Sequence, residues 1–126
     1  PAGHTIGGWG IEATVREYAK FGYLYSKNGL WEERQIIPEE WVWESLQPAS
    51  DSIKGYGYQW WLLPAFSGWE NSIVPRDTFI AIGLFEQQIF VIPSEELVIV
   101  RTANDLGSSG WNELEFLTLV LESILE

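Results

Sequence analysis

Glu86 is the residue whose surroundings first raise a question of chemistry. It lies in the stretch FIAIGLFEQQIFVIP, residues 79–93, in which two glutamines are the only other polar residues. Burying a carboxylate is costly unless it is paired or hydrogen-bonded. We therefore expect Glu86 either to be solvated at a strand end or bulge, or to take part in a site, and the first interpretation is favoured.

Histidine and paired carboxylates are the other groups that could act as acid or base. His4 is the only histidine, and no serine or carboxylate lies at motif spacing from it, so a surface position is predicted. The glutamate pairs at 32–33 and 39–40 fall in a predicted turn and in a predicted first helical turn. Nothing in their spacing fixes the geometry of a hydrolytic pair, and we expect a solvated face.

An aromatic cluster is the candidate binding feature. The chain contains eight tryptophans, and the segment YGYQWWLLP places Tyr58, Trp60 and Trp61 close together. These rings could stack on a sugar, but large aromatic side chains are also ordinary core residues. Their position directly before an apolar stretch favours packing in the core or in a cleft.

Composition limits the class of protein and its partners. A chain of 126 residues is long enough for one domain with a real core. Eighteen acidic against seven basic residues give a net charge of −11, which argues against nucleic acid or an anionic membrane as partner. The absence of cysteine and the single histidine predict no metal site, and no cofactor is expected. The first residues show no signal-peptide pattern and no stretch is apolar enough to span a membrane, so the compartment stays open.

The elements that must position these residues can be read from capping signals and apolar runs. Helices are predicted over residues 14–27, 38–47 and 112–125, beginning at a Thr14-x-x-Glu17 capping box, at Pro38 and at Asn112. Strands are predicted over residues 56–63, 78–85, 88–92 and 97–102, and LWEERQII reads as a short connection or small hairpin. The apolar runs do not alternate, so we expect strands that are covered on both faces. The last helix is apolar on both sides and is predicted to be largely buried. The fold class is α+β, with an antiparallel sheet and flanking helices.

Three segments in this order resemble a known family. GGWGIEATVREYAKFGYLYSKNGLWEERQIIPEEWV, then YGYQWWL, then GLFEQQIFVIPSEELVIVRTAND are similar to the C-terminal part of serine hydrolases of the β-lactamase and penicillin-binding-protein superfamily. The nearest likeness is to the class C β-lactamase, esterase and amide-hydrolase branch. The resemblance implies a five-stranded antiparallel sheet with helices on both faces. Residues 1–126 would then be one partial domain that lacks the N-terminal strands, the helix bearing Ser-x-x-Lys and the all-helical region.

The resemblance also implies which catalytic motifs should be present. The family attacks a carbonyl with the serine of Ser-x-x-Lys, assisted by a Tyr-x-Asn or Ser-x-Asn element. No serine of this chain has lysine three residues later, and Ser52 to Lys54 is one residue too short. The spacing from Tyr25 to Asn28 is one residue too long for the second motif. Neither motif is present in the sequence.

The third motif of the family aligns with the stretch that contains Glu86. There the family carries Lys-Thr-Gly, or a histidine-containing variant that ends in glycine and is often followed by glutamine. Leu84 and Phe85 replace the lysine or histidine and its neighbour, and Glu86 replaces the glycine. The resemblance implies that the backbone N–H of Gln87 is one oxyanion-hole donor. A glutamate side chain would crowd that place and bring negative charge to it, so the pattern indicates a lost site or the rim of an open cleft.

Two classes of function remain open. The favoured hypothesis is a truncated or fragmentary relative of a β-lactamase-like serine hydrolase, inactive alone. The alternative is an interaction or carbohydrate-binding module that uses the Trp- and Tyr-rich surface. We also predict a homo-oligomer, because the strand from Leu97 to Thr102 would have an open edge where the family places its N-terminal strands. Exposed aromatic side chains are the other expected contact between copies.

Overall fold

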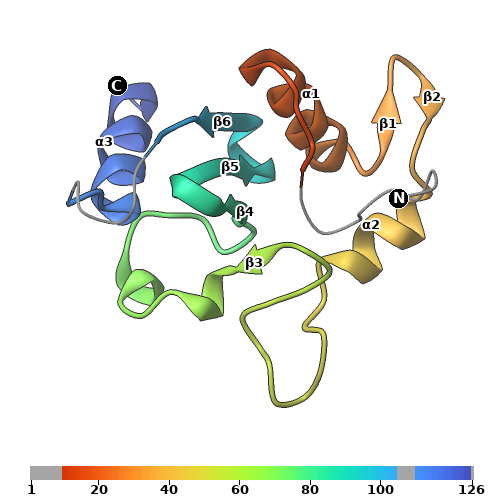
Figure 1. Cartoon of the computed structure of the whole chain (residues 1–126). Helices are drawn as coiled ribbons and strands as arrows, with labels where there is room; N and C mark the ends of the chain where they lie inside the picture. Colours follow the sequence, from red (N-terminus) through yellow and green to blue (C-terminus); the bar gives the residue numbers. More distant parts are fainter. Residues whose placement is uncertain (1–9, 105–109, 126) are drawn as a thin grey trace.

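A four-stranded antiparallel sheet organises the protein. In the computed structural model, which describes residues 10–104 and 110–125, the strands are β3 (Trp61–Leu62), β4 (Phe79–Gly83), β5 (Gln87–Ile92) and β6 (Leu97–Arg101). They lie in the order β3-β4-β5-β6, so β6 forms one edge of the sheet (Figure 1). The predicted pairing of the last two strands is confirmed, since Ile89 faces Val100 and Val91 faces Val98.

Each face of the sheet carries its own hydrophobic core. Helices α1 (Val15–Ser26) and α3 (Glu113–Leu125) lie on opposite sides of the strands (Figure 1). Successive residues of β5 alternate between the two cores: Phe90 packs with residues of α3, while Val91 belongs to the cluster that includes Tyr25 of α1. Five consecutive residues of β5, from 88 to 92, are buried. The expectation of strands covered on both faces is therefore confirmed for β5.

Helix α1 begins at the predicted capping box and lies close to the sheet. The Thr14 side chain accepts from the Glu17 N–H, and the Glu17 carboxylate accepts from the Thr14 N–H at 2.9 Å. At Gly22 a Cβ atom would lie 2.7 Å from a methyl carbon of Val98 and 2.9 Å from one of Ile89. A glycine at this position is what lets the helix approach strands β5 and β6 so closely.

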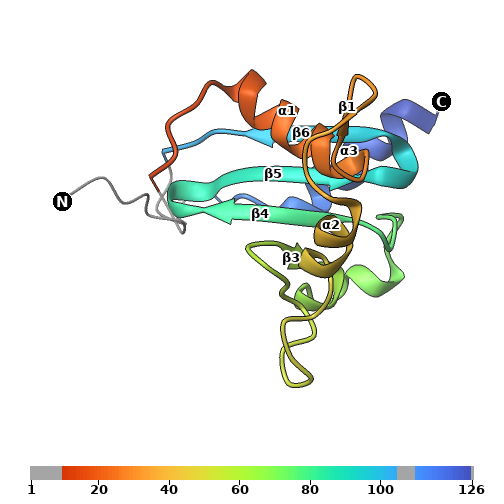
Figure 2. The same ribbon diagram turned by 90° about the vertical axis from the view of Figure 1, so that its right-hand side faces the viewer.

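A small hairpin and a second helix extend this side of the molecule. Strands β1 (Leu30–Trp31) and β2 (Arg34–Gln35) pair antiparallel across the turn at 32–33, which confirms the small hairpin. Helix α2 (Glu39–Ser45) follows, with Pro38 as its N-cap residue and acidic residues in its first turn. Figure 2 shows α2 below α1, beside strands β3 and β4. Val42 is the buried residue by which α2 joins the core on the α1 side.

Helix α3 covers the other face, but only along one stripe. Its start is held by Asn112, whose side chain accepts from the Glu115 N–H at 3.1 Å, as predicted. Leu117 and Leu121 are buried against the sheet, whereas Leu119 is 61% exposed. The prediction of a largely buried helix was wrong, because no described element covers the side that carries Leu119.

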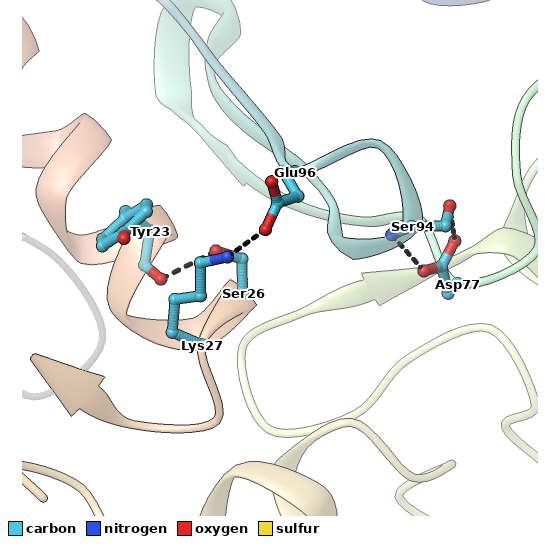
Figure 3. A network of polar contacts seen from close by, with 6 residues as sticks. All are labelled: Tyr23, Ser26, Lys27, Asp77, Ser94 and Glu96. Atoms are coloured by element: carbon cyan, nitrogen blue, oxygen red, sulfur yellow. Dashed lines mark hydrogen bonds and ion pairs between the residues drawn. The ribbon is translucent and has the colours of Figure 1, made fainter. Parts of the chain in front are cut away.

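The turn between β5 and β6 is supported by polar contacts (Figure 3). The Asp77 carboxylate accepts from both the N–H and the hydroxyl of Ser94, at 2.8 and 2.9 Å. Glu96, which has a left-handed backbone, accepts from the Lys27 ammonium at the end of α1. These contacts join the turn at 93–96 to the segment before β4 and to the C-terminal end of α1.

The segment predicted as a strand over residues 56–63 is largely a turn. Only Trp61 and Leu62 form β3, and Tyr56 makes an isolated bridge to Trp61. The Gly57 N–H donates to the Trp60 carbonyl, and the backbone at Gln59 is left-handed with φ of 68°. Aromatic content indicated a strand, but local turn hydrogen bonds prevail over the first half of the segment.

The fold class follows from these elements. The chain is α+β, with antiparallel sheets and flanking helices, as the sequence predicted. Within residues 10–104 and 110–125, no helix is long and apolar enough to cross a membrane.

Candidate functional site

The turn between β4 and β5 contains the residues for which the sequence resemblance predicts the third motif. Gly83 pairs with Gln87, and Leu84, Phe85 and Glu86 form the three-residue connection between them. Phe85 and Glu86 both have φ of 63°, so two successive residues with side chains occupy the left-handed region. That region favours glycine, since a Cβ atom meets steric repulsion there. The backbone of this turn is therefore suited to glycines that the sequence does not provide.

The side chains of the turn give it an apolar tip and one acidic group. Leu84 is 75% exposed and Phe85 is 38% exposed. Glu86 is half-buried rather than fully solvated, and its carboxylate lies 3.4 Å from Nε2 of Gln88. Glu86 thus lies in the connection between two strands, close to the strand end that the sequence indicated.

Contacts to the last residue of β6 and to the segment after it hold the turn in place. The Arg101 guanidinium donates to the Glu86 carbonyl at 2.6 Å. The Gln87 side chain donates to the Ala103 carbonyl and accepts from the Ala103 N–H at 3.3 Å. Both supports come from residues more than ten positions away, so the turn depends on tertiary contacts.

A buried amide below the turn links it to α3. Gln88 is 1% exposed; its Nε2 donates to Glu113 at 2.8 Å and its Oε1 accepts from Trp111 Nε1 at 2.9 Å. The Arg101 guanidinium lies over the Trp111 ring, 4.2 Å from its centre, in a cation–π arrangement. The sequence analysis missed this network. The available signal was a glutamine within a run of buried residues, because a buried amide requires partners.

The chemical capacity of this site is limited by what surrounds it. The sequence contains no Ser-x-x-Lys, so the turn has no nucleophile of the family type. Among residues 10–104 and 110–125, no group of three or more histidine, aspartate or glutamate side chains could hold a metal ion. His4 lies outside the described residues.

The three candidate aromatic residues do not form one platform. Trp60 is 2% exposed and packs in the core against Phe21, Tyr25 and Phe79, with ring centres 4.8 to 5.8 Å apart. Trp61 is 38% exposed and contacts Tyr56 and Phe66. The structure therefore turns Trp60, which directly precedes β3, inward and Trp61, the first residue of β3, outward.

Tyr58 lies apart from Trp61, beside helix α2. Its ring centre lies 5.6 Å from that of Trp41, and its hydroxyl donates to the Glu44 carboxylate at 3.1 Å. This hydrogen bond raises the pKa of the Tyr58 hydroxyl above its usual value. Within the described part of the chain, no ring contact joins Tyr58 to Trp61, so the aromatic residues do not converge as a sugar-binding surface would need.

Comparisons with known proteins agree with this fold. No protein-family model matches the chain. An uncharacterized protein of Alkalihalophilus pseudofirmus is 29% identical over 109 residues, which cover 80% of this chain and 32% of that protein. A solved structure named "Putative 6-aminohexanoate-dimer hydrolase from Bacillus anthracis" is 21% identical, with a TM-score of 0.58. It covers 89% of this chain, whereas the match spans 28% of that chain.

The solved structure shows a shared fold, and both matches cover only a part of longer proteins. The chain spans about a third of the curated relative, 32% of its length, and a smaller share of the solved structure. The likeness in three dimensions to this solved structure extends across most of this chain. The expected fold class is thereby confirmed: the chain has an α+β fold that it shares with part of that solved structure.

Proposed function

We propose that this chain corresponds to the C-terminal part of a β-lactamase-like serine hydrolase and has no hydrolytic activity by itself. One observation carries the proposal: the chain shares its fold with a hydrolase over 89% of its own length but over only 28% of that chain. The residues that would carry the nucleophile would lie in the remaining part, since no Ser-x-x-Lys occurs in this sequence.

The reaction of the complete protein would be acyl transfer to serine, followed by hydrolysis of an amide or ester. The solved relative is named for a 6-aminohexanoate dimer, and we extend only that class of substrate to the complete protein. In this assignment the chain contributes the β4–β5 hairpin, with the backbone N–H of Gln87 as one donor to the developing oxyanion.

The conformation of the β4–β5 turn supports this role for the hairpin. Phe85 and Glu86 occupy the left-handed region, which glycine adopts at little cost. The family's motif has glycine at the position of Glu86, so the left-handed backbone there is compatible with the residue that the family uses. A carboxylate at Glu86 would bring negative charge near the oxyanion, and this disfavours catalysis even if a nucleophile were supplied.

An activity measurement on the isolated chain tests the first half of the proposal. The chain is incubated with chromogenic β-lactams and p-nitrophenyl esters, and separately with a fluorescent penicillin. We expect no turnover above the buffer rate and no covalent label, because the serine nucleophile is absent. Detection by mass spectrometry of a labelled peptide containing one of the ten serines would refute it.

The DNA upstream of the codon for Pro1 tests the second half. We expect the same reading frame to continue and to encode Ser-x-x-Lys. A stop codon directly upstream, with a start of translation at this chain, would reject the fragment interpretation. The two results are independent, since an inactive chain could also be a complete protein.

A further inference from the structure

A groove lies between helix α1 and the β1–β2 hairpin, and apolar atoms form almost all of its surface. It is lined by Lys20, Phe21 and Leu24 of α1, by Trp31 of β1 and by Ile36, which follows β2. Figure 1 shows the hairpin beside α1. The volume of the groove is about 270 Å³, just below the range of about 300–1,000 Å³ that is usual for small-ligand sites. A groove of this size fits a small ligand.

Hydrogen bonds within one continuous segment, residues 20–36 and the residue after it, shape the groove. The Gly29 N–H donates to the Leu24 carbonyl at 2.8 Å, where α1 ends. The Gly29 carbonyl accepts from the N–H groups of Ile36 and Ile37 at 2.9 and 3.2 Å. Both walls of the groove therefore come from neighbouring parts of the sequence, and these bonds hold the hairpin against the end of α1.

The apolar lining of the groove remains in contact with water. Phe21 is 44% exposed and Ile36 is 49% exposed, while Leu24 and Trp31 are half-buried. The Trp31 ring meets the Tyr23 ring edge-on, with ring centres 5.8 Å apart, which fixes it as one wall. An apolar group in the groove would remove this surface from water, and the gain is proportional to the area covered.

Basic side chains lie around this groove, although the protein as a whole is acidic. Lys20 lines it, and Arg34 lies directly opposite Trp31 on the same face of the hairpin. Arg16 lies one helical turn before Lys20 on α1. These are three of the seven basic residues in a chain with a net charge of −11. Within residues 10–104 and 110–125, none of the three forms an ion pair.

The acidic groups that are near in sequence have other partners or positions. The Glu17 carboxylate accepts from the N–H and from the hydroxyl of Thr14, at 2.9 and 2.8 Å. Glu32 and Glu33 form the turn of the hairpin, and neither lines the groove. The net charge of −11 still repels a multiply charged anion, which favours a ligand with a single negative charge.

We propose that this groove binds a small amphipathic anion, a monocarboxylate with an apolar chain such as octanoate. The chain lies against Trp31 and Ile36, and the carboxylate lies at the rim beside Lys20, within reach of Arg34. A guanidinium matches the geometry of a carboxylate, and an ammonium supplies a point charge. The proposal does not rest on the proposed function, because it uses no group of the β4–β5 turn.

Titration of the unaltered chain with octanoate, octanol and octylammonium, followed by NMR of the backbone amides, tests the proposal. The three probes share one apolar chain and differ in charge. We expect saturable shifts centred in residues 20–36, with the tightest binding for octanoate and the weakest for octylammonium. Attraction to the net charge of the protein would give the opposite order. Binding should be weak, since an open groove covers only part of the ligand.

Two lysine variants test the contribution of charge. Lys20→Gln removes the ammonium at the groove, and Lys54→Gln makes the same change at an exposed position beside Asp51. Because exposed ion pairs are weak, we expect Lys20→Gln to weaken octanoate binding by about two- to fivefold. Its affinity for octanol should not change, and Lys54→Gln should bind all three probes as the unaltered chain does.

Two isoleucine variants test the apolar contribution. Ile36→Ala shortens a side chain of the lining, and Ile53→Ala shortens one that is equally exposed but lies outside the groove, 51% against 49%. We expect Ile36→Ala to weaken octanoate and octanol by the same factor and Ile53→Ala to weaken neither. Both positions are exposed, so the variants should keep the fold.

Three outcomes would overturn the proposal. One is binding of octylammonium that is as tight as that of octanoate. Another is a set of shifts that does not saturate or is centred outside residues 20–36. The third is an equal effect of Lys20→Gln and Lys54→Gln on octanoate binding. If Lys20→Gln does not fold, the order of the three probes on the unaltered chain still decides.

Discussion

The two turns at the ends of β5 are stabilised in different ways. The turn at 93–96 begins with Pro93, and Asp77 accepts two hydrogen bonds from Ser94 (Figure 3). The turn at 84–86 has no comparable side-chain cap, exposes Leu84, and places two successive residues with side chains in the left-handed region. One turn is supported by residues suited to turns, and the other by contacts from β6 and α3.

This difference separates a structural turn from an altered site. Proline and serine are ordinary turn formers, so the start of the 93–96 turn agrees with its shape, and Glu96 is its one left-handed residue. The 84–86 turn keeps a shape suited to glycine with residues that are not glycine, and Arg101 and Gln87 anchor it to the end of β6. Local disagreement between sequence and backbone is typical of functional sites and of sites that have lost a function.

The largest change in stability should come from removing the buried hydrogen bonds of Gln88 below the 84–86 turn. Gln88→Leu keeps the approximate size of the side chain but leaves Glu113 and Trp111 without this partner. Loss of such a buried hydrogen-bonding group costs about 1–3 kcal/mol. We expect a decrease of this size in the free energy of unfolding, measured by urea denaturation at fixed protein concentration.

The neighbouring glutamine provides the control for that experiment. Gln87→Leu removes hydrogen bonds to Phe85 and Ala103 from a residue that is only half-buried, where water can replace part of what is lost. Its loss of stability should be smaller. If Gln88→Leu leaves the free energy of unfolding unchanged, the buried network does not stabilise the 84–86 turn, and the contrast between the two turns is refuted.

Removing the cap of the other turn should have the next largest effect. Asp77→Ala deprives both the N–H and the hydroxyl of Ser94 of their acceptor, and the loss of a comparable helix cap costs about 1 kcal/mol. Asp51→Ala, at an exposed position with a weak ion pair to Lys54, makes the same charge change. Urea denaturation should show a clear loss for Asp77→Ala only, and equal losses would show that net charge explains both.

The backbone of the 84–86 turn gives a prediction in the opposite direction. A left-handed residue with a side chain is destabilising by roughly 1–2 kcal/mol, and Glu86→Gly removes this strain. Glycine is also more flexible in the unfolded chain, which reduces the gain by roughly 0.5–1 kcal/mol. We expect a net stabilisation of about 0.5–1 kcal/mol. Glu95→Gly, in the other turn and without a positive φ, should be destabilising instead. A loss of stability in Glu86→Gly would mean that the carboxylate contributes more than the strain.

The sequence predicted the elements well where short-range signals coincide. The capping box at Thr14 and the cap at Asn112 both begin helices, and the pairing of β5 with β6 followed from two apolar runs around a short polar turn. It did not predict the turn at 56–60. There the local bond from the Gly57 N–H to the Trp60 carbonyl is joined by one from the Tyr58 N–H to the Ser45 carbonyl, and the second bond joins segments whose approach depends on tertiary structure. The network around Gln88 has the same origin, since its partners lie on α3 and before it.

The smallest effect concerns the ion pair that joins the 93–96 turn to α1. The hydrogen bond from Lys27 lowers the pKa of the Glu96 carboxyl, and the same bond raises the pKa of the Lys27 ammonium. A lowered carboxyl pKa stabilises the fold above the unfolded-state pKa, and this contribution is lost as pH falls through the folded-state pKa. The raised pKa of Lys27 sets the alkaline end of the pH range in which the pair stabilises the fold. Its contribution is complete below the pKa of lysine in the unfolded chain and is lost as pH rises through the folded-state pKa.

The pair should therefore stabilise the fold at neutral pH and lose its effect in acid. We expect thermal unfolding of the unaltered chain and of Glu96→Gln to differ slightly at neutral pH and to coincide in strong acid. Glu96 is exposed and Lys27 is partly exposed, so the difference should be small and should shrink further as salt is added. Glu95→Gln changes the same charge without this partner and should follow the unaltered chain at every pH. A difference between Glu96→Gln and the unaltered chain that persists in acid would assign the effect to packing of the side chain rather than to its charge, and the support of the 93–96 turn would then rest on Asp77 and Ser94 alone.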